Sequence, residues 1–125
     1  MKKIISIDKA PLAVGPYSQA VVHNNMIFLS GQICINPETS EMERDSIARQ
    51  TRRVLHNIKN ILEEAGSSLD KVLKCNVYIS SMEKFEDMNE VYKEFFSVNP
   101  PARVTVAVKE LYDDLDIEMD VIAYI

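Results

Sequence analysis

Cysteine is scarce in this chain, which carries only Cys34 and Cys75 among its 125 residues. Two thiols are too few for the framework of several disulfides that holds many small secreted proteins together. Both lie inside apolar, strand-like runs, where a reduced cysteine behaves as a small buried hydrophobic residue. We therefore expect two structural thiols and a protein of a reducing compartment, the cytoplasm.

Long apolar runs are also absent. No stretch approaches the roughly 18 consecutive apolar residues that a membrane-spanning helix needs. Only four uncharged residues separate Lys3 from Asp8, which is too short for the apolar core of a secretory signal. These absences argue against a membrane partner and agree with a cytoplasmic location.

Positive charge is in deficit, with 14 Lys and Arg residues against 19 Asp and Glu residues and a net charge of −5. This balance argues against sequence-independent binding of nucleic acid, which depends on basic side chains that neutralise phosphates. The two histidines, His23 and His56, have no partner at metal-ligand spacing, so we expect no metal site. The chain also lacks a Gly-rich phosphate loop and the Gly-x-Ser-x-Gly sequence of many serine hydrolases.

Hydrophobic periodicity predicts six strands and two helices. Alternating apolar residues indicate strands at residues 3–7, 18–22, 26–30, 69–80, 100–108 and 115–121, and residues 31–35 continue the third strand past a bulge at Gly31. A helical period predicts one helix over residues 45–65, ended by Gly66, and a second from a capping box at residues 80–83 to about residue 99. Asn24 and Asn25 tolerate positive φ and suit a tight hairpin turn.

The order of these elements, β-β-β-α-β-α-β-β, fits a single domain over residues 1–125. Two helices are too few to cover both faces of a sheet, so we predict a two-layer α+β sandwich, with a mixed six-stranded sheet and both helices on one face. The other face would be too polar for the core of a monomer, and we expect other copies of the chain to cover part of it. That face is predicted to hold Ser30, Gln32, Cys34, Asn76, Tyr78, Arg103, Thr105, Ala107, Glu118 and Ile122.

Arg103 is the one cation in the uncharged stretch of residues 100–108. Alternation puts Val104, Val106 and Val108 on one face of this strand, which we predict to be the core face, and Arg103 on the other. Glu118 lies on the polar face of the last predicted strand, and a hairpin of the two strands would bring the pair together. One interpretation is a cross-strand ion pair worth ~0.2–1 kcal/mol. The other is a guanidinium that binds a ligand carboxylate through two parallel hydrogen bonds.

Several short stretches, taken together and in order, resemble the RidA (YjgF-like) family of enamine/imine deaminases over essentially the whole chain. They are AVGPYSQA at residues 13–20, SGQI at 30–33, NIKNILEEAG at 57–66, NEVY at 89–92, PAR at 101–103 and IE at 117–118. The resemblance implies a chorismate-mutase-like fold and a homotrimer with a central barrel and three clefts between subunits. It also implies hydrolysis of reactive imines, such as 2-iminopropanoate and 2-iminobutanoate, to 2-keto acids and ammonia without a cofactor or a metal.

The resemblance also assigns roles to particular residues. Arg103 matches the arginine that binds the substrate carboxylate, and Glu118 matches the acid that activates the attacking water. Substrate-binding positions of the cleft correspond to Tyr17, Ser30, Gly31, Asn89 and Thr105. This chain departs from the family pattern in three places: Thr105 replaces a cysteine that contacts the ligand largely through its backbone, Val104 replaces a common serine, and Pro100 replaces an aromatic residue.

Two other functions stay open at this stage. A regulator that binds a small ligand without turnover would need the same arginine. Contact with RNA, described for some relatives, would use the basic side of the first helix, whose simpler interpretation is a solvated face interleaved with acids. That side carries Arg44, Arg49, Arg52, Arg53 and Lys59.

Overall fold

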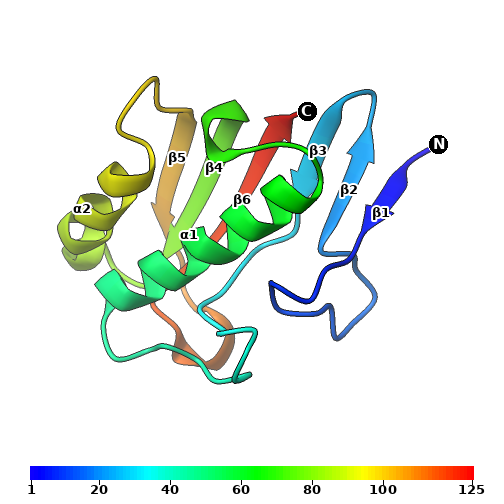
Figure 1. Ribbon diagram of the computed structural model, residues 1–125. Coiled ribbons are helices and arrows are strands. Elements are labelled where there is room, and N and C mark those ends of the chain that lie inside the picture. Colours follow the sequence, from blue (N-terminus) through cyan, green and yellow to red (C-terminus); the bar gives the residue numbers. More distant parts are fainter.

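The computed structural model describes all 125 residues and has the predicted order of strands and helices (Figure 1). Three short 3₁₀ turns join them. The strands and helices are β1 (Lys3–Ile5), β2 (Ala20–His23), β3 (Met26–Leu29), α1 (Ile47–Glu64), β4 (Val72–Ile79), α2 (Phe85–Phe95), β5 (Ala102–Ala107) and β6 (Ile117–Tyr124).

The first helix has clear chemical signals at both ends. The hydroxyl of Ser46 accepts a hydrogen bond from the backbone N–H of Arg49 at 3.1 Å, so α1 begins at Ile47 rather than at residue 45. At the other end Gly66 has φ of 86°, and the N–H of Ser67 donates to the carbonyl of Leu62 at 2.8 Å. This is the Schellman arrangement, in which a left-handed glycine ends the helix, as predicted.

The second helix is shorter than predicted. Ser81 accepts a hydrogen bond from the N–H of Glu83 at 3.2 Å, which opens a 3₁₀ turn, Met82–Lys84, that runs directly into α2. The helix ends at Phe95, and Asn99, before the two prolines, has a left-handed φ of 47°. The helix therefore ends several residues before Pro100, so the proline is not what terminates it.

Two local predictions about the third strand had different outcomes. The β2–β3 turn is confirmed, because Asn24 and Asn25 have φ values of 50° and 61°. The continuation over residues 31–35 is wrong. This segment makes only two isolated bridges, Gln32 with Met119 and Ile35 with Met42, and Cys34 is fully buried instead of lying on the open face.

The sheet is mixed and six-stranded, in the order β1-β2-β3-β6-β4-β5. The predicted hairpin of the last two strands is wrong. β6 lies between β3 and β4 and is antiparallel to both, and β5 pairs in parallel with β4 at the edge. Helix α2 is the crossover that a parallel pair requires.

Both helices cover the same face of the sheet, as predicted (Figure 1). The core between the two layers includes the fully buried residues Val54, Leu55, Ile58, Ile61 and Leu62 of α1 and Cys75, Val77, Ile79, Ile117 and Met119 of β4 and β6. Burying each large aliphatic side chain contributes about 1.5–3 kcal/mol, so this interface holds the two layers together. Neither helix is long and apolar enough to cross a bilayer.

The predicted faces of β5 are reversed. Val104 and Val106 are 43% and 40% exposed on the helix-free face, whereas Arg103 and Thr105 point toward α2. Alternation shows which residues share a face but not which face is covered, and the parallel register aligns Arg103 with the buried Cys75. A register shift between Val72 and Lys74 likewise breaks the alternation of β4 and leaves the apolar Leu73 exposed.

Candidate functional site

Arg103 is held beneath helix α2 at the edge of the sheet. Its Nη1 donates a hydrogen bond of 2.7 Å to Oδ1 of Asn89, and the guanidinium carbon lies 4.6 Å from the ring centroid of Tyr92 and 5.5 Å from that of Phe85. These distances are in the range of cation–π attraction. Asn89, which the resemblance places among the substrate-binding residues, faces the sheet and orients the arginine.

The two aromatic partners of Arg103 were not recognised from the sequence. Phe85, Asn89 and Tyr92 stand at i, i+4 and i+7, which places them on one face of α2. That spacing can be read from the sequence, but it does not show that Arg103 lies against this face of the helix. We call Arg103, Asn89 and Thr105, with these two rings, the arginine group.

The arginine group also contains an unpaired buried polar atom. Oγ1 of Thr105 is buried and has no hydrogen-bond partner in the chain, whereas the buried hydroxyl of Tyr92 lies beside the thiol of Cys75. Cys75, beside Arg103 in the register, is no nucleophile, because burial raises the pKa of its thiol to about 12. The chemistry of this group therefore depends on the guanidinium.

Glu118 lies on the helix-free face of β6, close to Gly31. Its carboxylate is partly buried and forms no hydrogen bond or ion pair within the chain, whereas the partly buried Glu43 pairs with Arg53 and Asp116 pairs with Lys84. Burial, and secondarily the negative charge of Asp120, raises the pKa of Glu118 above its usual value. A carboxylate with these properties is suited to accepting a proton from water.

Gly31 has no side chain, and the carboxylate of Glu118 occupies the space that a Cβ atom would take there. A methyl group added at this position would lie 2.1 Å from Oε2 of Glu118 and 2.9 Å from its Cδ. We expect Gly31→Ala to push the Glu118 carboxylate out of place with little change in thermal stability. Gly15→Ala is the matched control, because a methyl group there makes only ordinary contacts with Tyr17. Crystal structures and melting temperatures of both variants test this, and a Glu118 side chain in its wild-type position in Gly31→Ala would contradict it.

A cavity of about 470 Å³ opens beside Glu118 and Gly31. Tyr17, which is exposed, and Ser30 line it, and the hydroxyl of Ser30 donates to the carbonyl of Ser18 at 2.6 Å. The structure thus brings together four predicted residues, which we call the glutamate group: Tyr17, Ser30, Gly31 and Glu118. The remaining wall is mainly apolar, and includes Leu12, Val14, Ile33, Ile35, Met42 and Tyr112.

Gln19 fixes the loop that forms one side of this cavity, a role that sequence reasoning missed. Its buried side chain donates to the carbonyls of Ile7 at 3.0 Å and Pro11 at 2.7 Å, and it accepts from the N–H of Ile7 at 2.7 Å. A fully bonded buried amide of this kind stabilises one loop conformation. Only its place in the stretch at residues 13–20 singled it out in the sequence.

The arginine group and the glutamate group do not meet within one chain. Arg103 of β5 is aligned with Cys75 of β4, which is aligned in turn with Val121 of β6. These three residues lie on the helix-covered face. Glu118 of β6 is aligned with Tyr78 of β4, which is aligned in turn with Val106 of β5. These three residues lie on the opposite, helix-free face. The predicted sharing of a sheet face is therefore wrong, and Arg103 and Glu118 form no cross-strand ion pair.

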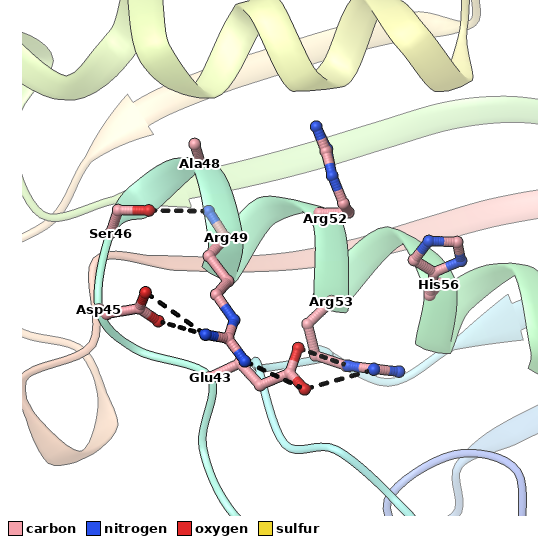
Figure 2. A pocket seen from close by; sticks show the side chains of 8 residues that line it. All are labelled: Glu43, Asp45, Ser46, Ala48, Arg49, Arg52, Arg53 and His56. Atoms are coloured by element: carbon pink, nitrogen blue, oxygen red, sulfur yellow. Dashed lines mark hydrogen bonds and ion pairs between the residues drawn. The ribbon is translucent and has the colours of Figure 1, made fainter.

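A second cavity, of about 550 Å³, lies over the basic side of α1 (Figure 2). Its cations are already paired: Arg49 contacts Asp45 at 3.2 Å, Arg53 contacts Glu43 at 3.1 Å, and the guanidinium of Arg53 holds the pKa of Glu43 below its usual value. Arg52 pairs with Glu94 on α2 at 2.7 Å. This neutralisation weakens the case for an RNA-binding surface, which needs excess positive charge.

The whole chain is similar in sequence and in structure to several known proteins. A family model described as Endoribonuclease L-PSP matches residues 7–125. A RutC family protein of Pyrococcus abyssi is 52% identical, over 98% of this chain and 97% of that protein. The chloroplastic Reactive Intermediate Deaminase A of Arabidopsis thaliana is 38% identical, over 98% of this chain and 65% of that protein. The crystal structure of E. coli TdcF with bound serine superposes with a TM-score of 0.93 and 40% identity, covering 98% of each chain.

Proposed function

The chain belongs to the RidA (YjgF-like) family, which the Endoribonuclease L-PSP model describes, and we propose that it hydrolyses 2-imino acids to 2-keto acids and ammonia. The substrates we propose are 2-iminopropanoate, 2-iminobutanoate and their enamine tautomers. One relative is named a reactive intermediate deaminase, and another has been crystallised with serine, a small molecule that carries a carboxylate. Both names agree with this class of substrate.

The observation that carries the proposal is that most hydrogen-bond donors of the Arg103 guanidinium have no partner within the chain. A guanidinium has five N–H donors, and here one hydrogen bond within the chain, to Asn89, orients it. The rings of Phe85 and Tyr92 hold it from α2 without using its donors. The remaining fork of donors matches the two oxygens of a carboxylate, which every 2-imino acid carries next to its reactive carbon.

Glu118 supplies the acid–base chemistry in this proposal. Its carboxylate takes a proton from water as the water oxygen bonds to C2 of the protonated imine, which gives a carbinolamine. The same group then returns the proton to nitrogen and the C–N bond breaks. Ammonia leaves with the bonding electron pair as the hydroxyl gives its proton to the Glu118 carboxylate and becomes the keto oxygen, and Glu118 passes that proton to ammonia or to solvent. Imines of this kind also hydrolyse in water, so binding and orientation supply much of the acceleration needed.

Because one chain holds its arginine and glutamate groups on opposite faces, we propose a site shared between copies in a homotrimer. The helix-free face of the sheet supports this, since it exposes apolar side chains that a soluble monomer would bury. They are Ile4, Phe28, Leu73, Val104, Val106 and Tyr124. In the proposed trimer, Arg103 of one subunit and Glu118 of the next face the same substrate.

A charge on this face tests the assembly. We expect Val106→Asp to convert a trimer into monomers at micromolar concentration and to abolish activity, because an unpaired carboxylate buried at an interface costs several kcal/mol. Met82→Asp is the control, since Met82 is 54% exposed on the helix side of the molecule. Sedimentation equilibrium measures the outcome, and a wild-type protein that is already monomeric would contradict the shared site.

Release of keto acid from a coupled reaction tests the function. A threonine dehydratase generates 2-aminocrotonate and 2-iminobutanoate, and we expect the protein to accelerate the appearance of 2-ketobutanoate in proportion to its concentration. A binding regulator would bind a stable carboxylate analogue through Arg103 and leave the rate of keto-acid release unchanged. That result would replace the enzyme with the regulator.

A further inference from the structure

Asp120 is held in a fixed position on the helix-free face of β6. Its Oδ1 accepts a hydrogen bond from Nδ2 of Asn76 at 2.7 Å, and its Oδ2 accepts one from the hydroxyl of Tyr78 at 3.0 Å. Both donors come from β4, the neighbouring strand. Each carboxylate oxygen therefore has its own donor, so the charge of Asp120 is fixed in place.

The same network leaves Glu118 without a donor. Glu118 and Asp120 are two residues apart on β6, so their side chains share a face, and Tyr78 is directly opposite Glu118 in the register. The phenol of Tyr78 nevertheless donates to Asp120 rather than to its direct neighbour. Glu118 is thus a partly buried carboxylate with a like charge beside it and no hydrogen bond to stabilise its ionised form.

On the premise of the proposed function, we propose that Asp120, fixed by Asn76 and Tyr78, is a positioning residue that makes Glu118 a stronger proton acceptor toward the attacking water. Within the chain, no positively charged side chain faces Glu118 to oppose this effect. In the proposed trimer, Arg103 of the next subunit faces Glu118 across the substrate, and its charge is the same with or without the carboxylate of Asp120. The titratable neighbours of Glu118 within the chain are Tyr78 and Asp120 on the sheet, and Tyr17 and Tyr112 line the same cavity. No Lys, Arg or His is among the residues that line that cavity.

The direction of the effect follows from the charges. Burial is the larger cause of the raised pKa of Glu118, and Asp120 adds to it. A like charge on a neighbouring side chain disfavours the ionised form of a carboxyl group. Removal of the Asp120 charge therefore lowers the pKa of Glu118, and a weaker base takes a proton from water less readily.

Asp120→Asn tests the inference, with Tyr78→Phe as the matched variant that removes a hydrogen bond but keeps the charge. The readout is the titration of the Glu118 side-chain carboxyl, followed by ¹³C NMR of glutamate-labelled protein and assigned by its loss in Glu118→Gln. We expect the midpoint to fall by about 0.5 to 1 pH unit in Asp120→Asn and to stay near the wild-type value in Tyr78→Phe.

The pH profile of imine hydrolysis gives a second readout. In Asp120→Asn the acidic limb should move to lower pH by the same amount, and the plateau rate should fall about two- to fivefold. An unchanged Glu118 midpoint in Asp120→Asn, or an equal shift in both variants, would overturn the inference even in an active deaminase. A shifted midpoint in a protein with no imine hydrolysis would instead overturn the proposed function and leave the coupling of the two carboxylates standing.

Discussion

Replacing Arg103 by alanine should lower kcat/KM for 2-iminobutanoate by about 10²- to 10⁴-fold and leave the protein folded. Two charge-assisted hydrogen bonds to the substrate carboxylate are each worth ~1.5–3 kcal/mol, and their loss converts to a rate change of that size. The fold should tolerate the change, because Arg103 is at the edge strand and its one bond is to the partly exposed Asn89. Activity in the coupled assay and a thermal melt measure both parts.

Arg52→Ala is the matched control for this loss. Arg52 donates two hydrogen bonds to Glu94, at 3.0 and 2.7 Å, but it is exposed, and an exposed ion pair is worth only ~0–1 kcal/mol. We expect wild-type activity in this variant. Arg103→Lys adds a finer comparison, because lysine keeps the charge and loses the planar fork, so activity should be only partly restored. Wild-type activity in Arg103→Ala would remove the arginine group from the site.

Glu118→Gln should lower kcat by about 10²- to 10⁴-fold and change KM little, because general acid–base catalysis contributes that much and binding depends on Arg103. Glutamine is nearly isosteric with glutamate, so the contact with Gly31 is kept. The acidic limb of the pH–rate profile should disappear as well. Since the pKa of Glu118 is raised, the wild-type limb should lie above the usual range of a glutamate, with activity lost as the pH falls through it.

The control for this variant is Glu64→Gln, which removes an exposed carboxylate at the end of α1. We expect it to keep both the rate and the shape of the pH profile. Should Glu118→Gln retain the wild-type kcat, another group must activate the water, and the glutamate group would at most bind the substrate.

Local chemistry in the sequence predicted most of the elements. The stripe of apolar residues on α1, the left-handed Gly66 and the two asparagines of the β2–β3 turn are signals that act over a few residues, and the structure confirms each one. Boundaries were less certain where tertiary contacts decide them. The segment at residues 31–35 was expected to be a strand, and it makes only single bridges.

The arrangement of strands could not be predicted in the same way. Alternation has a period of two, so it groups Arg103 with Thr105 without showing whether that face meets the helices. The answer depends on β4, which separates β5 from β6 and sets the register of both. The roles that the resemblance gives to Arg103 and Glu118 are residue by residue and stay predictions, but their expected closeness within one chain was wrong.

The central place of β6 also affects how the chain folds. β6 is the last of the six strands to be synthesised, yet it joins the β1-β2-β3 meander to the β4-β5 pair. Until β6 pairs, the folding chain has two separate pieces of sheet, each with an open edge that β6 will cover. Such edges are prone to pairing with other chains, so the chain is most open to misassembly before β6 takes its central place.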